Sequence, residues 1–247
     1  MLSKSQKKLI KSLYQKKYRK QHKMFVVEGK KGIQELLQAR WELHALYSTE
    51  EKFFEVPAEK FFAVSENELK QISFLTTPQV ALAVFYMPDD VTTSGKGLVV
   101  ALDDVRDPGN LGTIIRLCDW FGVRELVCSE KTVDCFNPKV IQATMGSITR
   151  VCIVYSDLQK YLSTCVDRGI PVMGAFMEGD NVYKTELPVN GVLVMGNEAN
   201  GVSEETEKII RQKIAIPQFG QGQKTESLNV ATATAILLSE FKRGGNI

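Results

Sequence analysis

The fold of this 247-residue chain is decided by residues 98–116, which read Leu-Val-Val-Ala-Leu-Asp-Asp-Val-Arg-Asp-Pro-Gly-Asn-Leu-Gly-Thr-Ile-Ile-Arg. The first five residues are a continuous apolar run, which is typical of a strand that is buried on both faces. After a polar loop, apolar side chains recur at helical spacing at Leu111, Ile114, Ile115 and Cys118. The stretch therefore predicts a buried strand that leads through a polar loop into a helix.

The same alternation continues to the C-terminal part of the chain. Four more apolar runs follow, at residues 125–128, 151–155, 172–176 and 192–195. Helical stretches lie between them, such as 157–168, which we expect to begin after an N-cap at Ser156 and to end before Gly169. Apolar strands separated by helices indicate an α/β fold with a parallel sheet that is covered on both faces.

The residues before this region predict a second, smaller α/β domain. A stretch rich in Asp, Thr, Ser and Gly at 89–97 has the composition of a linker. It separates a domain over 1–88 from one over 98–247. In the first domain we expect a basic helix over about 3–17, a helix that runs from 28 to 37, and a capping box at Ser65 and Glu68. Short apolar runs predict strands at 24–27, 44–47 and 81–86.

Positive charge is concentrated at the N-terminus. Residues 1–31 hold eleven basic side chains and one acid, a net charge of +10, whereas the remaining 216 hold 20 basic and 28 acidic side chains, a net charge of −8. A basic end on an acidic body favours a polyanion such as RNA over a merely solvated helix. Aromatic side chains among the lysines could stack on unpaired bases. The residues that we assign to RNA binding are Lys7, Lys8, Lys16, Lys17 and Arg19.

Several other classes of protein are disfavoured. The five cysteines are an odd number without a Cys-x-x-Cys pair, and the two histidines are isolated. These counts predict reduced thiols in the cytoplasm, no disulfide framework and no metal site. No apolar run approaches the roughly 20 residues of a transmembrane helix, and the first residues lack the apolar segment of a secretory signal. We therefore expect neither a membrane protein nor a secreted one.

Three polar segments lie where ligands bind in parallel sheets, beyond the carboxyl ends of strands. Each has an ordinary structural explanation when it is taken alone: Asn110 as a helix N-cap, 196–201 as a tight turn, and Ser227 with Asn229 as caps of a final helix. Arg116, opposite the apolar stripe of its helix, could be a solvated side chain. Dinucleotide-binding and hydrolase signatures are missing, and 220–225 departs from a P-loop by one residue, Gln223.

Taken together, these segments resemble the SpoU (TrmH-like) family of RNA 2′-O-ribose methyltransferases, of the SPOUT class. The matching blocks are 107–116, 195–201, Ile216-Pro217 and 227–230. The N-terminal part is similar to the RNA substrate-binding domain that many members carry, through 17–19 and 25–29, and that domain resembles a small RNA-binding ribosomal protein. The sequence departs from the family pattern at 219–225, where the loop is longer than its commonest form. This loop could reshape the rim of the cofactor site or the entrance for RNA.

The resemblance implies a C-terminal deep trefoil knot, a homodimer, and S-adenosylmethionine held by backbone groups of the knotted loops. The general rule that chains are un-knotted would not predict this. The cofactor contacts that it implies fall at Met195, Gly196, Asn197, Gly201, Ile216 and Leu228. The polar positions that it implies for catalysis are Asn110, Arg116, Glu198, Ser227 and Asn229.

The chemistry assigns these residues different roles. A methyl sulfonium is already activated, so no metal is required. Arg116 is the family's catalytic arginine, but a guanidinium stays protonated in water. We therefore expect Arg116 to bind the phosphate beside the target ribose and to stabilise an alkoxide-like oxygen. Asn110 and Glu198 would orient Arg116 and its loop, and Ser227 and Asn229 would hold the ribose or the knot.

The function that we expect is methyl transfer from S-adenosylmethionine to a ribose 2′-hydroxyl of structured RNA. Ribosomal RNA is favoured over transfer RNA because of the N-terminal domain, by analogy. The alternatives are a transfer RNA 2′-O-methyltransferase and a non-catalytic RNA-binding ribosome-assembly factor of the same fold. A base methyltransferase of the same class is a third. The presence of all five polar positions favours an enzyme.

Overall fold

A computed structural model describes residues 2–50, 53–89, 92–220 and 227–243. The chain divides into two compact units. Unit 1 comprises Met1–Asp90 together with Asp134–Thr149, and unit 2 comprises Val91–Val133 and Arg150–Ile247. The predicted linker at 89–97 stays a prediction. The sequence did not indicate that the segment Asp134–Thr149, from the middle of the chain, packs with the N-terminal residues.

Unit 2 is built on six parallel strands in the order β10-β8-β9-β5-β6-β7. The five apolar runs of the sequence form the strands of this sheet, as predicted. A sixth, the short edge strand β10, was not predicted. The strands are β5 (Leu98–Leu102), β6 (Glu125–Ser129), β7 (Cys152–Ser156), β8 (Val172–Asn181), β9 (Gly191–Met195) and β10 (Gln212–Ala215).

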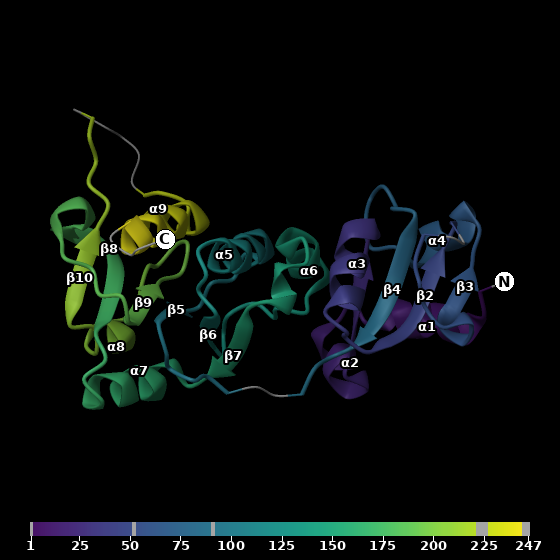
Figure 1. Cartoon of the computed structure of the whole chain (residues 1–247), viewed down its shortest axis with the longest axis horizontal. Helices are drawn as coiled ribbons and strands as arrows, with labels where there is room; N and C mark the ends of the chain where they lie inside the picture. Colours follow the sequence, from purple (N-terminus) through teal and green to yellow (C-terminus); the bar gives the residue numbers. More distant parts are fainter. Residues whose placement is uncertain (1, 51–52, 90–91, 221–226, 244–247) are drawn as a thin grey trace. The chain divides into compact units, whose positions relative to one another are not determined.

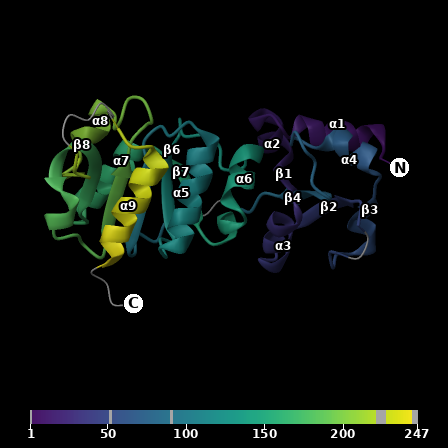
Figure 2. The ribbon, with the colours of Figure 1, turned by 90° about the horizontal axis from the view of Figure 1, so that it is seen from above.

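Helices cover both faces of this sheet, as the apolar strands predicted (Figures 1 and 2). The helices α5 and α9 lie side by side on one face, and α7 and α8 lie on the other. Because successive side chains of a strand point to opposite faces, Val99 and Ala101 of β5 lie on the same face. There they pack with Leu158 and Leu162 of α7. The bounds are α5 (Pro108–Trp120), α7 (Leu158–Asp167), α8 (Glu204–Glu207) and α9 (Val230–Arg243).

Unit 1 contains a four-stranded sheet in the order β1-β4-β2-β3, in which only the β2–β3 pair is parallel. Figure 2 shows α1 and α4 on one face and α3 on the other. The helix α6 packs along the edge strand β1. The strands are β1 (Met24–Glu28), β2 (Leu43–Ser48), β3 (Phe61–Ala63) and β4 (Ala81–Tyr86). The helices are α1 (Lys4–Ser12), α2 (Lys16–His22), α3 (Lys30–Gln38), α4 (Glu66–Ile72) and α6 (Pro138–Thr144).

The predicted basic helix over 3–17 is wrong in extent, because two helices occupy this stretch. The carbonyls of Leu13 and Tyr14, which a continuous helix would use for its own backbone bonds, accept hydrogen bonds from the Arg19 guanidinium at 2.9 and 2.7 Å. The capping box at Ser65 and Glu68 is confirmed.

Two predicted N-caps are also corrected. Asp107 rather than Asn110 caps α5, because Pro108 takes the first helical position and the Asp107 carboxylate accepts from the Asn110 backbone N–H. Asp157 rather than Ser156 caps α7, since β7 extends to Ser156. None of the five cysteines, all of which lie in the described ranges, forms a disulfide. None of the helices in the described ranges is long and apolar enough to span a membrane.

An ion pair inside unit 1 joins residues far apart in sequence. Arg19 is only 1% exposed, and its Nε and Nη2 donate to Oδ2 of Asp134 at 3.0 and 2.5 Å. A buried charge without such a partner is strongly disfavoured. The segment that contains Asp134 is therefore needed to neutralise a charge in the core of unit 1.

Replacing Asp134 by alanine should destabilise unit 1 by about 3–5 kcal/mol, because it leaves the Arg19 guanidinium buried without a counter-charge. The matched control is Glu50→Ala, which breaks the exposed pair of Glu50 with Lys30 in the same unit and should cost about 0–1 kcal/mol. Urea unfolding of the full chain measures both. Equal losses in the two variants would contradict a buried role for Arg19.

Candidate active site

Three segments of unit 2 meet through one chain of side-chain hydrogen bonds. Asn110, in the first turn of α5, donates through Nδ2 to Oε1 of Glu198 at 3.0 Å. Asn229, just before α9, donates through Nδ2 to Oδ1 of Asn110 at 2.8 Å. Three of the five residues that the resemblance assigned to catalysis are thus brought together, although up to 119 positions separate them in sequence.

The Glu198 carboxylate holds the start of α5. Besides the Asn110 amide, it accepts hydrogen bonds from the backbone N–H groups of Arg106 at 3.2 Å and Asp107 at 3.1 Å. Burial raises the pKa of Glu198, but these hydrogen bonds outweigh that effect and hold it below its ordinary value. The group is therefore ionised at neutral pH, and its charge lies at the positive end of the α5 dipole.

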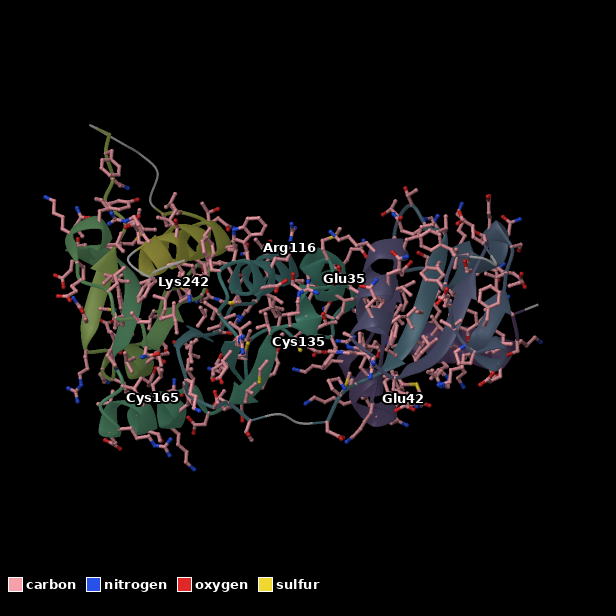
Figure 3. All side chains as sticks on the ribbon, in the orientation of Figure 1. Glu35, Glu42, Arg116, Cys135, Cys165 and Lys242 are labelled. Atoms are coloured by element: carbon pink, nitrogen blue, oxygen red, sulfur yellow. The ribbon has the colours of Figure 1, made fainter. Side chains whose placement is uncertain are left out.

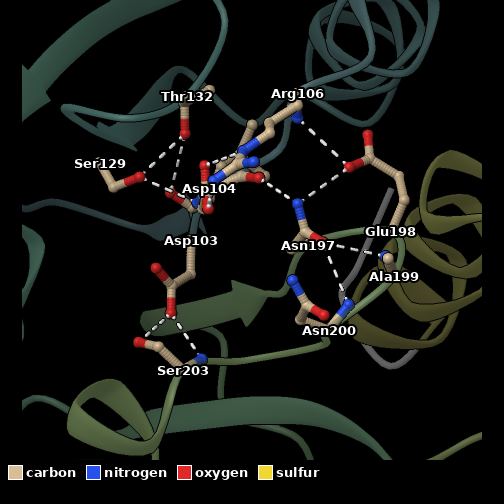
Figure 4. Close-up of polar contacts among 11 residues, drawn as sticks. Asp103, Asp104, Arg106, Ser129, Thr132, Asn197, Glu198, Ala199, Asn200 and Ser203 are labelled. Carbon is tan, nitrogen blue, oxygen red and sulfur yellow. Dashed lines mark hydrogen bonds and ion pairs between the residues drawn. The ribbon is translucent and has the colours of Figure 1, made fainter.

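The loop that carries Glu198 is fixed by Asn197 (Figure 4). The Asn197 side chain donates through Nδ2 to the Asp104 carbonyl at 2.6 Å and accepts at Oδ1 from the backbone N–H groups of Ala199 and Asn200. Its backbone pairs with Gly201 in both directions, at 2.8 and 3.0 Å. The loop is consequently closed on itself and tied to the end of β5.

Gly196 is required by the packing of this loop. A Cβ atom at Gly196 would lie 2.2 Å from the Gly201 carbonyl carbon and 2.3 Å from the Val202 nitrogen. The backbone of the same loop therefore leaves no space for a side chain at this position. Gly201 has a φ of +68°, a backbone conformation that favours glycine.

Sequence reasoning missed the two acids at the end of β5. The buried Asp103 accepts hydrogen bonds through Oδ2 from the Ser203 backbone N–H and hydroxyl, which ties down the start of α8. Asp104 has a φ of +59° and pairs with Arg106 at 2.7 Å, while its N–H donates to Ser129 (Figure 4). The sequence feature that could have identified Asp103 and Asp104 is that they are two consecutive acids directly after a buried strand.

Arg116 lies further along α5 and is not part of this hydrogen-bonded group. Its side chain is exposed, and it makes no hydrogen bond or ion pair with any residue of the described ranges (Figure 3). Asn110 and Glu198 bind each other and the start of the helix rather than Arg116 itself, so their predicted role in orienting Arg116 and its loop stays a prediction. Ser227 is exposed, and its role stays a prediction.

The predicted cofactor residues come from three places in unit 2. Met195 ends β9 in a buried position, and Gly196, Asn197 and Gly201 form the loop after it. Ile216 follows β10, and Leu228 stands before α9 with 47% of its surface exposed. The longer loop predicted at 219–225 falls largely outside the described residues. The exposed apolar side chain of Leu228 and the polar loop after β9 together fit a bound molecule that has both apolar and charged parts.

The RNA-binding assignment needs one correction. Lys8, Lys16 and Lys17 are exposed, and Lys7 is partly exposed with its ammonium donating to Gln71 at 2.6 Å. Arg19, by contrast, is buried, and its guanidinium is engaged by Asp134 and two carbonyls. Arg19 therefore cannot contact RNA, and its position within a lysine-rich run was misleading.

This architecture defines an α/β protein whose polar site lies beyond the carboxyl ends of parallel strands. A family model described as "SpoU rRNA Methylase family" matches residues 97–239, and one described as "MRM3-like substrate binding domain" matches residues 4–83. The chain belongs to the SpoU rRNA methylase family. It is accordingly a methyltransferase that uses S-adenosylmethionine.

Similar proteins match over nearly the whole chain. The Bacillus subtilis 23S rRNA (guanosine(2553)-2′-O)-methyltransferase RlmP is 31% identical over 94% of each chain. A TrmH-family structure from Porphyromonas gingivalis has a TM-score of 0.90 and 38% identity, covering 98% of this chain and 99% of its own. An AdoMet-bound rRNA methyltransferase from Sinorhizobium meliloti has a TM-score of 0.86 and 28% identity, covering 100% of this chain and 98% of its own.

Replacing Asn110 by alanine should lower methyl transfer to RNA by about 100-fold, because misplacing α5 by an ångström misaligns the reacting groups. The matched control is Asn200→Ala in the neighbouring loop, since only the backbone N–H of Asn200 is used there. Transfer of a labelled methyl group measures activity, and thermal unfolding verifies that each variant is folded. A similar loss in both variants would contradict a specific role for Asn110.

Proposed function

We propose that the protein transfers the methyl group of S-adenosylmethionine to a ribose 2′-hydroxyl of ribosomal RNA. The observation that carries this proposal is the hydrogen-bonded group Glu198–Asn110–Asn229, which joins the three segments of the family resemblance at one end of the sheet. The ribosomal substrate is supported by relatives named as 23S rRNA guanosine 2′-O-methyltransferases, RlmP of Bacillus subtilis and RlmB of Neisseria meningitidis.

The cofactor would be held by the loop after β9 and by the segments around Ile216 and Leu228. The closed turn from Gly196 to Gly201 provides a rigid backbone surface, and the exposed Leu228 side chain can cover an apolar part of the cofactor. When bound, the cofactor supplies a methyl group that its positive sulfur already activates. The residues proposed for this task are Met195, Gly196, Asn197, Gly201, Ile216 and Leu228.

Arg116 would bind the RNA rather than remove a proton. A guanidinium is a cation with five N–H donors rather than a base, and no described residue pairs with that of Arg116. It can therefore bind a phosphate beside the target ribose and stabilise the negative charge that develops on the attacking oxygen. Asn110, Glu198 and Asn229 keep the start of α5 in place, so they set the position from which Arg116 acts. Ser227 would contact the ribose.

The exposed lysines of unit 1 would bind the phosphate backbone of the RNA. Lys8, Lys16 and Lys17 lie in α1 and α2, and Lys7 keeps part of its surface exposed. Phosphate contacts of this kind supply affinity and register without reading the sequence. They are consistent with a separate domain whose task is to hold structured RNA.

Three further features implied by the family resemblance belong to the same proposal. A trefoil knot is supported by the hydrogen bond that brings Asn229 back to Asn110. A cytoplasmic location is supported by the five cysteines, which are reduced rather than paired in disulfides. A homodimer is supported by Trp120, which ends α5 and is 84% exposed. Light scattering should give the mass of two 27.6-kDa chains, and a single-chain mass would contradict the dimer.

The deciding experiment is transfer of a labelled methyl group to ribosomal and transfer RNA from cells that lack this protein. We expect label in an alkali-resistant dinucleotide of large-subunit ribosomal RNA, because a methylated 2′-oxygen cannot attack its neighbouring phosphate. Label only in transfer RNA would keep the chemistry and overturn the substrate. Absence of both label and cofactor binding would favour the non-catalytic RNA-binding alternative.

Replacing Arg116 by alanine should reduce this transfer by about 10²–10³-fold while cofactor affinity stays nearly unchanged. The control is Arg168→Ala, an exposed arginine that follows α7 on the opposite face of the sheet. Calorimetry measures cofactor binding for each variant. Equal losses of turnover and cofactor affinity in Arg116→Ala would instead indicate a structural role.

A further inference from the structure

A pocket in unit 1 lies beside the edge strand β1, outside the site described above. It is bounded by the turn between α1 and α2, the end of β1, the residues after α4 and the first turns of α6. It is a small hollow with a cavity volume of about 40 Å³ that opens to solvent. The polar and aromatic residues that line it are Tyr14, Glu28, Phe74, Lys139 and Gln142.

Glu28 is a buried carboxylate with spare capacity to accept hydrogen bonds. It is 9% exposed; Oε2 accepts from the Ser73 hydroxyl at 2.5 Å and Oε1 from the Phe74 backbone N–H at 2.8 Å. Two carboxylate oxygens offer about four acceptor sites, so roughly half are not used by any described residue. Burial raises the pKa of Glu28 in spite of these bonds and of the nearby Lys11. A further donor that enters the pocket would therefore stabilise the charged form.

An aromatic wall adjoins this carboxylate. The Tyr14 ring is 51% exposed and meets Phe74 edge-on, with ring centroids 5.2 Å apart. The Lys11 ammonium lies 5.6 Å from the Phe74 centroid and donates to the Ser73 carbonyl, so it holds Phe74 and the residue before it together. The exposed ring of Tyr14 is left as a surface on which a flat group can stack.

Two polar side chains of α6 complete the lining. The ammonium of Lys139 is exposed and the amide of Gln142 is half-buried, and neither has a hydrogen-bond or ion-pair partner within the described ranges. The pocket thus offers a stacking surface, a carboxylate acceptor, an amide and a cation. These are complementary to a nucleotide: a flat ring, an amino group on its edge and a phosphate.

We propose that this pocket binds an unstacked base of the RNA substrate that carries an exocyclic amino group, with Glu28 accepting from that group and Tyr14 stacking on the ring. Uracil, which has no exocyclic amine, would be disfavoured. The proposal rests on the proposed function. The surrounding charge favours RNA over a basic peptide, because residues 1–31 carry a net charge of +10 and Lys139 lines the pocket.

The test compares binding of fluorescent oligocytidine and oligouridine octamers to the full-length protein. These two pyrimidine probes differ chiefly in the amino group and the ring nitrogen beside it. We expect about tenfold tighter binding of oligocytidine. Glu28→Gln should reduce this preference to about one while total affinity for long RNA stays within about twofold, since phosphate contacts supply most of that affinity.

A second variant guards against misfolding of Glu28→Gln. Tyr14→Ala removes an exposed ring and should weaken both oligonucleotides by about tenfold. Its control is Tyr18→Ala, which removes an aromatic of the same basic segment that does not line the pocket and should leave both affinities nearly unchanged. Equal losses in the two variants would overturn the stacking role.

Other outcomes separate this proposal from the proposed function. Equal binding of the two octamers, or a preference that survives Glu28→Gln, overturns the base pocket. If methyl transfer persists in either case, the proposed function stands without it. If Glu28→Gln removes the preference for oligocytidine but the protein transfers no methyl group to any RNA, the pocket would be supported and the enzymatic function overturned. Displacement of oligocytidine by an arginine-rich peptide, with binding lost in Glu28→Gln, would assign the pocket to a basic protein partner and overturn the proposal.

Discussion

The hydrogen bonds of a single side chain, that of Asn110, connect the parts of unit 2 on which the site depends. Its amide nitrogen donates to the Glu198 carboxylate and its carbonyl oxygen accepts from Asn229. A neutral amide side chain can donate to a carboxylate through its nitrogen and accept from a second amide through its oxygen. An aspartate here would place two carboxylates together, and an alanine would remove one hydrogen bond from Glu198 and one from Asn229.

The parts of the fold that could be predicted are those whose physical cause is local. A strand buried on both faces must be continuously apolar, so β5 and β9 were evident from the apolar runs at 98–102 and 192–195. The edge strand β10 was missed because it has only four residues, two of them buried. The cap of α5 was misplaced because Asp107 and Asn110 are both good N-cap residues, and only the backbone distinguishes them.

Residues whose environment is set by distant contacts could not be predicted from their neighbours. Arg19 stands in a lysine-rich run and has the pattern of a solvated cation, yet Asp134, 115 positions away, makes it part of the core. In the site, the family resemblance selected Asn110, Glu198 and Asn229, but nothing in their spacing specified which would pair. The left-handed backbone of Asp104 had no signal beyond a residue type that tolerates it.

The segment Asp134–Thr149 shows why the two family matches do not map simply onto the two units. It lies within the 97–239 match to the methylase family, yet its contacts are with the N-terminal residues. Phe136 packs against Phe25 and Trp41, with centroids 4.8 and 6.4 Å apart, and a Cβ at Gly146 would lie 2.5 Å from the Glu35 side chain. Because α6 also provides Lys139 and Gln142 of the unit 1 pocket, the surface proposed for base recognition is built from both regions of the sequence. A change in this segment would therefore act on substrate recognition even though its sequence lies in the methylase match.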